Sequence, residues 1–214
     1  MKLYLDTGNI KEIEEINNWG VLSGVTTNPS LLSKEGGLNK DTIRNICDMV
    51  KGPVSVEVTS LTPEEMVSEA LELKEISPYL VIKIPATVEG LKATRALSEK
   101  GIPVNMTLIF SPSQALLAAE AGARYVSPFV GRLDDTGIEA LEVVQDIREI
   151  FDIGGYDTEI IFASVRHPSH VIRAARIGAD IATIPYRVFT LLIKHPMTEL
   201  GLKKFMQDWN NLNK

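Results

Sequence analysis

One lysine, Lys83, stands in the middle of an apolar run, Val81-Ile82-Lys83-Ile84-Pro85. Lysine is rarely buried, because an ammonium group loses much of its hydration energy when it leaves water. Burial also favours the neutral amine, which is the form that can attack a carbonyl carbon and form a Schiff base. The alternative is a lysine on an edge strand, or one whose stem lies along the surface while its charge stays in solvent. The surroundings of Lys83 decide between these interpretations.

Other strand-like runs also separate polar from aliphatic side chains. Side chains alternate between the two faces of a strand, so every second residue shares a face. In 54–59 the three valines share one face and leave Glu57 on the other, and in 103–109 the aliphatic residues likewise leave Asn105 and Thr107 together. The polar residues that this alternation groups opposite the aliphatic faces are Asp6, Glu57, Lys83, Asn105, Thr107 and Ser127.

These runs belong to a regular alternation of short strand-like and longer helical segments. The expected strands are 2–6, 24–27, 54–59, 80–85, 103–109, 125–130, 159–164 and 181–184. Helical patterns are expected at 40–50, 62–76, 88–100, 113–121, 138–151 and 168–177. Eight strands that alternate with helices in 214 residues predict an α/β fold, a single (β/α)8 TIM barrel. An amphipathic tail helix at about 199–211 follows it, and no composition break divides 1–214 into two domains.

The barrel gives the polar set a location. The outer face of a barrel strand packs on helices and should be aliphatic, so the polar side chains should point inward, where branched apolar residues are usual. Unpaired buried polar groups are costly, which favours an active site at the carboxyl ends of the strands. Glu57 and Thr107 are suited to moving protons and positioning a water around an imine, while Asp6 and Asn28 suit substrate hydroxyls. Whether desolvation or the nearby carboxylates decide the charge of Lys83 stays open at this point.

Three residues indicate a phosphorylated substrate. Arg132 follows the sixth expected strand, and Ser164 and Arg166 end the seventh. Barrels often bind phosphate near the loops after their last strands, and arginine makes bidentate contacts to phosphate oxygens. The alternative for either arginine is an ordinary surface salt bridge.

Composition excludes several classes of protein. The formal net charge of −6 argues against nucleic acid as the main partner. No secretory signal and no apolar run of about 20 residues is present, so we expect a cytoplasmic protein without a membrane partner. Cys47 is the only cysteine, which excludes an internal disulfide and a thiolate metal cluster. His167, His170 and His195 do not form a metal set with a carboxylate, and no glycine-rich nucleotide motif occurs, so no metal and no cofactor is expected.

Six short motifs together resemble the transaldolase family. The resemblance covers essentially the whole chain and is to the small-subunit branch, which contains bacterial transaldolases and fructose-6-phosphate aldolases. The motifs are Leu5-Asp6-Thr7, Gly24-Val25-Thr26-Thr27-Asn28-Pro29-Ser30, Ile82-Lys83-Ile84-Pro85, Asn105-Met106-Thr107-Leu108, Ser127-Pro128-Phe129-Val130-Gly131-Arg132 and Ala163-Ser164-Val165-Arg166.

The resemblance implies a Schiff-base mechanism without a cofactor. Lys83 would bind the ketose donor, Asp6 would take the hydroxyl proton during carbon–carbon cleavage, and Glu57 would act through a water and Thr107 on the imine. Asn28, Asn105 and Ser127 would orient the dihydroxyacetone unit, and Thr26 and Phe129 would also lie at the substrate. Arg132, Ser164 and Arg166 would hold a phosphate. The expected reaction passes dihydroxyacetone from sedoheptulose 7-phosphate or fructose 6-phosphate to glyceraldehyde 3-phosphate or erythrose 4-phosphate, in the non-oxidative pentose phosphate pathway.

Two positions separate the branches of this family. Transaldolases carry Glu at the position of Glu57 and Phe at that of Phe129, where the aldolases carry Gln and Tyr, and Asn105 also follows the transaldolase pattern. The sequence therefore resembles a transaldolase, with an aldolase that releases free dihydroxyacetone as the alternative. A catalytically idle barrel that only binds sugar phosphate is a third hypothesis. The resemblance further implies a homo-oligomer, a pentamer or decamer, in which the tail helix reaches a neighbouring subunit, although Phe205 and Trp209 fit packing on their own barrel equally well.

Overall fold

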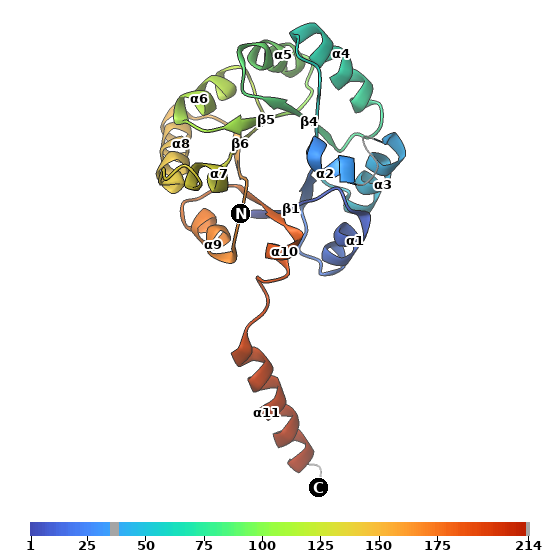
Figure 1. Ribbon diagram of the computed structural model, residues 1–214, viewed down its shortest axis with the longest axis vertical. Coiled ribbons are helices and arrows are strands. Elements are labelled where there is room, and N and C mark those ends of the chain that lie inside the picture. Colours follow the sequence, from blue (N-terminus) through green and yellow to red (C-terminus); the bar gives the residue numbers. More distant parts are fainter. Residues whose placement is uncertain (35–38, 213–214) are drawn as a thin grey trace.

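Eight parallel strands close into a barrel with helices around the outside (Figure 1). The computed structural model describes residues 1–34 and 39–212. Each strand pairs with the next along the chain, and the last strand pairs with the first through a parallel register that joins Lys2 to Ile181 and Asp6 to Pro185. The predicted (β/α)8 barrel with an additional carboxyl-terminal helix is confirmed.

The strands are generally shorter than the sequence pattern predicts. They comprise β1 (Lys2–Asp6), β2 (Gly24–Thr26), β3 (Val54–Glu57), β4 (Leu80–Pro85), β5 (Val104–Ile109), β6 (Tyr125–Pro128), β7 (Glu159–Phe162) and β8 (Ile181–Pro185). The helices of the described chain are α1 (Ile10–Asn18), α2 (Pro29–Lys34), α3 (Lys40–Val50), α4 (Pro63–Lys74), α5 (Val88–Ser98), α6 (Pro112–Glu120), α7 (Val130–Asp134), α8 (Ala140–Gly154), α9 (Pro168–Arg176), α10 (Tyr186–Phe189) and α11 (Pro196–Leu212).

Local signals explain where several helices begin and end. Thr62 caps α4 by accepting a hydrogen bond from the backbone N–H of Glu65, and Pro63 occupies the first turn, where a missing N–H costs nothing. Helix α8 ends at Gly155, whose φ of +67° places it in the left-handed region that favours glycine. The helices expected at 62–76 and 138–151 agree with α4 and α8 within a few residues.

Around β5 and β6 the sequence-based prediction is wrong in detail. The expected alternation continues through Leu108, but Leu108 has φ of +57° and the register with β6 shifts between Met106 and Ile109. Such a bulge inserts an unpaired residue and turns the strand. The expected strand 125–130 likewise ends at Pro128, and α7 begins at Val130, so Phe129 lies in the connection between them. The short helices α1, α2, α7 and α10 were not predicted.

The lower half of the barrel interior is apolar. Five buried side chains from different strands pack together there: Tyr4, Val81, Tyr125, Ile161 and Ile181. Gly24 makes room for this cluster, because a Cβ atom at its position would lie 2.6 Å from Cζ of the Tyr4 ring. The polar inward-facing residues therefore lie above this packed cluster, toward the carboxyl ends of the strands.

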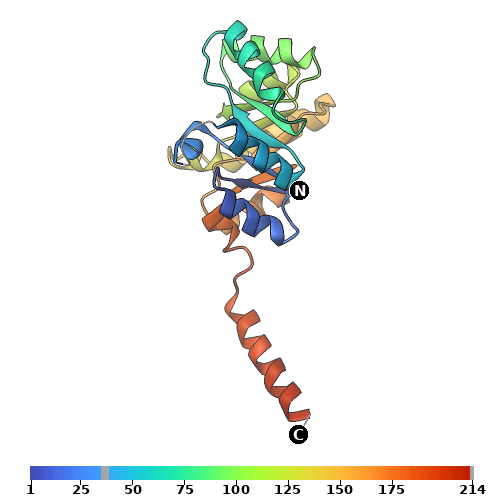
Figure 2. The ribbon, with the colours of Figure 1, turned by 90° about the vertical axis from the view of Figure 1, so that its right-hand side faces the viewer.

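Helix α11 projects away from the barrel (Figures 1 and 2). None of its described residues is buried, and Phe205 and Trp209 are 70% and 63% exposed. Packing of the tail on its own barrel, one of the two alternatives left by the sequence, is therefore wrong for this structure. No helix in the described chain is both long and apolar enough to cross a membrane.

Candidate active site

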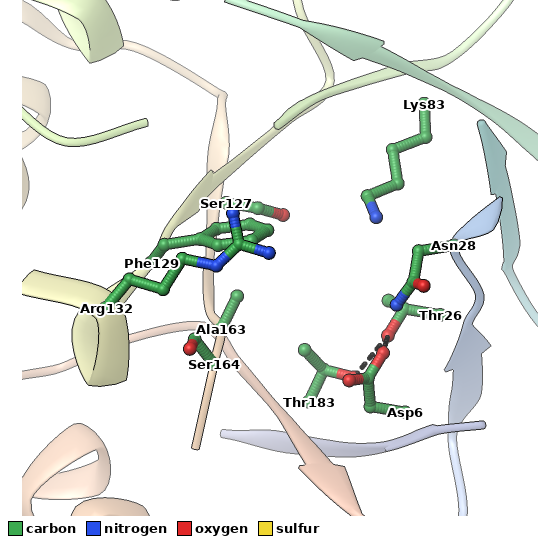
Figure 3. Close-up of a pocket in the computed structure, with 10 residues that line it drawn as sticks. All are labelled: Asp6, Thr26, Asn28, Lys83, Ser127, Phe129, Arg132, Ala163, Ser164 and Thr183. Atoms are coloured by element: carbon green, nitrogen blue, oxygen red, sulfur yellow. Dashed lines mark hydrogen bonds between the residues drawn. The ribbon is translucent and has the colours of Figure 1, made fainter. Parts of the chain in front are cut away.

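A pocket opens at the carboxyl ends of the strands (Figure 3). The residues that line it are Asp6, Thr26, Asn28, Lys83, Ser127, Phe129, Arg132, Ala163, Ser164 and Thr183. All but Ala163 and Thr183 were predicted to be site residues from the sequence. Four other predicted residues, Glu57, Asn105, Thr107 and Arg166, do not line it. Their positions relative to the pocket differ.

Lys83 is buried, with only 5% of its surface exposed. The register of β3 and β4 pairs Glu57 with Lys83, and Nζ of Lys83 lies 3.0 Å from Oε2 of Glu57. The same amine donates a hydrogen bond of 3.0 Å to the backbone carbonyl of Thr27. Strand β4 lies between β3 and β5, so the edge-strand alternative for Lys83 is excluded. Glu57 thus contacts the amine directly.

Asp6 accepts a hydrogen bond from a threonine on one neighbouring strand, and that threonine contacts a second threonine on the other. Oγ1 of Thr26 donates to Oδ1 of Asp6 at 2.8 Å and lies 2.6 Å from Oγ1 of Thr183 (Figure 3). Burial raises the pKa of Asp6, while the hydrogen bond from Thr26 and the charge of Lys83 lower it less strongly. A carboxyl group with a raised pKa holds a proton more readily than an ordinary aspartate, which suits a group that takes up and returns a proton. Thr183 was missed, although alternation in 181–184 places it on the same face as Ile181.

Asn105 lies behind the pocket wall and orients a residue that does line it. Oγ of Ser127 donates to Oδ1 of Asn105 at 2.7 Å, and Nδ2 of Asn105 donates to Oγ of Ser55 at 3.2 Å. All three side chains are buried. Ser55 was not proposed from the sequence, but its position two residues before Glu57 in β3 is the signal that could have identified it.

Thr107 is fully buried beside the bulge of β5. Its Oγ1 atom has no hydrogen-bond partner in the described part of the chain. A buried hydroxyl normally finds a partner in the protein, in water or in a ligand. Binding of a water by this hydroxyl would therefore break no internal hydrogen bond.

The two predicted phosphate-binding arginines differ in position. The Arg132 guanidinium lies 4.9 Å from the centre of the Phe129 ring and points into the cavity (Figure 3). Nη2 of Arg166 instead lies 2.7 Å from Oδ2 of Asp135. The surface salt-bridge alternative thus describes Arg166 in this structure. Ser164, which lines the pocket, has φ of +61°, a strained conformation of the kind found at functional sites.

The histidines have a carboxylate neighbour that the sequence did not reveal. Oδ2 of Asp134 lies 3.2 Å from Nε2 of the buried His170, so the expectation that no carboxylate accompanies these histidines is wrong. Burial and the neighbouring His167 lower the pKa of His170, whereas Asp134 raises it less. Among the described residues, no group of three or more histidine, cysteine, aspartate or glutamate side chains is arranged to bind a metal ion.

Solved structures with little sequence identity share the fold. A lactate oxidase from Pediococcus acidilactici, described as putative, superposes with a TM-score of 0.60 at 16% identity, over 89% of this chain and 64% of that one. A thiamine phosphate pyrophosphorylase from Pyrococcus furiosus superposes with a TM-score of 0.59 at 14% identity, over 86% of this chain and 85% of that one. At such low identity the likeness concerns the barrel alone.

Curated relatives are much more similar in sequence. A protein named probable transaldolase from Thermodesulfovibrio yellowstonii is 56% identical over 214 residues, all of both chains. Another from Alkaliphilus metalliredigens is 56% identical over the same length, and one from Aquifex aeolicus is 53% identical over 99% of this chain and 98% of its own. The family model described as transaldolase/fructose-6-phosphate aldolase matches residues 3–214. With that match over nearly its full length, and with a buried lysine, carboxylates and an arginine gathered at one end of its barrel, the chain belongs to the transaldolase/fructose-6-phosphate aldolase family.

Proposed function

We propose that this protein is a transaldolase that transfers a dihydroxyacetone unit between sugar phosphates through a Schiff base on Lys83. The observation that carries the proposal is the buried Lys83 amine, which lines a polar pocket and lies 3.0 Å from the Glu57 carboxylate. The name probable transaldolase, carried by relatives that match this chain from end to end, supports the same reaction.

The first steps join the ketose to Lys83. The amine loses a proton to Glu57, attacks the C2 carbonyl carbon and forms a carbinolamine. Glu57 then returns a proton to the C2 hydroxyl, which leaves as water while the C2–N bond becomes an iminium. The unpartnered hydroxyl of Thr107 suits the proposed role of holding this water.

Carbon–carbon cleavage requires a base at the C4 hydroxyl. In our proposal Asp6 accepts that proton, the C3–C4 bond breaks and the aldose leaves. The electron pair of the broken bond stays on the three-carbon fragment, where the iminium accepts it to form an enamine. An incoming aldose phosphate reverses the sequence: the enamine carbon attacks its aldehyde, and Asp6 returns the proton to the new hydroxyl. The raised pKa of Asp6 suits a group that must carry a proton between the two halves of the reaction.

Binding groups are proposed on both sides of the lysine. Asn28 and Ser127 line the pocket near Lys83 and can bind the hydroxyls of the dihydroxyacetone unit, with Asn105 orienting Ser127. Arg132 and Ser164 face the cavity and suit the phosphate. Such an exchange of sugar phosphates belongs to the non-oxidative pentose phosphate pathway.

The second candidate is an aldolase that releases free dihydroxyacetone. Release requires the enamine to gain a proton from solvent or from a nearby acid. Phe129 lines the pocket with an apolar ring, whose centre lies 5.9 Å from that of the Phe110 ring in an edge-on contact. A phenylalanine side chain has no hydroxyl that could supply a proton or bind a water. The enamine would then persist until an aldehyde arrives, which favours transfer.

Borohydride trapping tests the Schiff base. Treatment with fructose 6-phosphate and sodium borohydride should add a reduced dihydroxyacetone group to Lys83, located by peptide mapping. Lys74 is the control, because burial lowers its pKa, while its amine donates to the carbonyls of Pro78 and Leu80 outside the pocket. The label should vanish in Lys83→Gln and persist in Lys74→Gln. A wild-type protein unlabelled at Lys83 would contradict both enzyme hypotheses.

Turnover then separates transferase from lyase. Fructose 6-phosphate should be consumed only when erythrose 4-phosphate is present as the acceptor. Equal consumption without an acceptor, with dihydroxyacetone accumulating, would establish the aldolase instead.

Assembly and location complete the proposal. We propose that residues 1–214 act as one barrel domain with its tail, and that α11 packs on another subunit of a homo-oligomer, a pentamer or a decamer. The exposed apolar side chains of α11 support this assembly. A cytoplasmic location follows from the proposed substrates, since charged sugar phosphates do not cross a membrane unaided.

A further inference from the structure

Arg166 is bound to a carboxylate outside the pocket. Its Nη2 atom lies 2.7 Å from Oδ2 of Asp135, and the two side chains are 53% and 63% exposed. Asp135 directly follows α7, the helix that carries Arg132. The two arginines therefore lie on neighbouring segments, but only Arg132 faces the cavity.

The backbone and stem of Arg166 are held independently of this ion pair. The backbone N–H of Arg166 donates to Nδ1 of the buried His170 at 3.4 Å, and Nε2 of the same ring faces Asp134 at 3.2 Å. The stem of Arg166 lies against Gly131. A Cβ atom built on Gly131 would be only 2.8 Å from Cγ of Arg166 and 2.6 Å from its Nε. The guanidinium can therefore change partner by side-chain rotation while the rest of the residue stays in place.

Charge determines which partners compete for this guanidinium. A phosphate monoester carries nearly two negative charges near neutral pH and has three strong acceptor oxygens, so it is a stronger acceptor than a single carboxylate. A phosphate bound at Arg132 would be close to the stem of Arg166, since Gly131 adjoins both residues. An unphosphorylated sugar offers the guanidinium no comparable charge.

We propose that Asp135 is a specificity-determining residue: it holds Arg166 outside the pocket until the phosphate of a phosphorylated sugar replaces Asp135 as the partner of the guanidinium. This inference rests on the proposed function, which brings a sugar phosphate into the pocket. Each phosphorylated substrate must then break the Arg166–Asp135 ion pair in order to bind, so its binding is weaker by the free energy of that pair. The pair leaves unphosphorylated substrates unaffected, because they never recruit Arg166.

The test compares two exposed arginine–carboxylate pairs of the same region. Asp135→Asn removes the competing carboxylate, and Glu139→Gln is the control, because Glu139 contacts Nη2 of Arg173 at 2.9 Å with 53% and 46% exposure. An exposed pair corresponds to about 0.2–1 kcal/mol. Asp135→Asn should therefore lower the KM for fructose 6-phosphate up to about fivefold, with kcat unchanged. The kcat/KM for unphosphorylated fructose should stay constant, and Glu139→Gln should change neither value.

A direct binding measurement keeps this inference separate from the reaction. Calorimetric titration with inorganic phosphate should show tighter binding to Asp135→Asn by the same factor. A raised KM and weaker phosphate binding would mean that Asp135 positions Arg166 for the substrate, and unchanged values would mean a surface pair without effect on binding; either result overturns the proposal. A wild-type protein without turnover of any sugar would refute the proposed function, while the phosphate titration would still decide the role of Asp135.

Discussion

Replacing Thr107 with valine should stabilise the protein and impair its activity. The Thr107 hydroxyl is fully buried and has no hydrogen-bond partner in the described chain, and a buried polar group without a partner costs about 1–3 kcal/mol. Valine keeps the shape and suits a strand. We expect the free energy of unfolding to rise by about 1–2 kcal/mol, which raises Tm by about 2–8 °C for a chain of this size. If the hydroxyl positions a catalytic water, kcat should fall at least about tenfold.

Thr27→Val is the matched control. Thr27 is also fully buried, but its Oγ1 atom donates a hydrogen bond of 2.8 Å to the carbonyl of Ser55. Removing this bond should lower the free energy of unfolding by about 0.5–1.5 kcal/mol. The same substitution at two equally buried threonines should thus shift stability in opposite directions.

Equilibrium urea unfolding at one fixed protein concentration measures both variants. The midpoint should rise for Thr107→Val and fall for Thr27→Val, with unchanged m-values. A Thr107→Val midpoint that falls as far as that of Thr27→Val would show that the Thr107 hydroxyl is satisfied in the folded protein, and our reasoning about this site would be refuted. An unchanged kcat would separately remove Thr107 from the proposed mechanism.

Three further predictions concern Asp6, Phe129 and the tail. Because burial raises the pKa of Asp6, the folded protein favours the protonated carboxyl more than the unfolded chain does. The contribution of Asp6 to the free energy of unfolding is therefore present at low pH and is lost as the pH rises through the pKa of the folded state. The Tm of Asp6→Asn should therefore exceed that of the wild type by a margin that grows as the pH rises above the ordinary pKa of an aspartate, with kcat reduced about 10²-fold or more; a margin that shrinks would contradict this sign. Phe129→Tyr should raise the ratio of dihydroxyacetone release to transfer, measured with and without erythrose 4-phosphate, and an unchanged ratio would remove Phe129 from the account of specificity. Phe205→Glu should reduce the oligomer mass measured by light scattering, because this side chain is 70% exposed on α11, whereas an intact assembly would place the subunit contact elsewhere.

Alternation along the strands was sufficient to predict the centre of the site. Glu57 and Lys83 lie opposite aliphatic neighbours in β3 and β4, and the parallel register of two regular strands brings them together. Alternation was insufficient at Leu108, because a bulge depends on how β5 meets β6 rather than on the residue types within one strand. The alternating pattern is thus reliable only where pairing is regular.

The partners of long side chains were beyond sequence reasoning. Arg166 follows a strand at the expected end of the barrel, yet it pairs with Asp135, 31 positions earlier in the chain. Ser55 and Thr183 are small polar residues whose roles depend on contacts with Asn105 and Thr26 across the barrel. No single strand contains the information that sets such contacts.

The apolar cluster beneath the pocket has a consequence for the order of events. Tyr4 and Tyr125 pack in the buried cluster beneath the pocket, so we expect the departing aldose and the arriving acceptor to use the same opening at the carboxyl ends of the strands. In the proposed mechanism the first sugar must therefore vacate the pocket before the second can enter, and the enzyme keeps the three-carbon fragment in the interval. The proposed reaction would thus be a double displacement, in which the three-carbon fragment stays on Lys83 between the departure of one aldose and the arrival of the next.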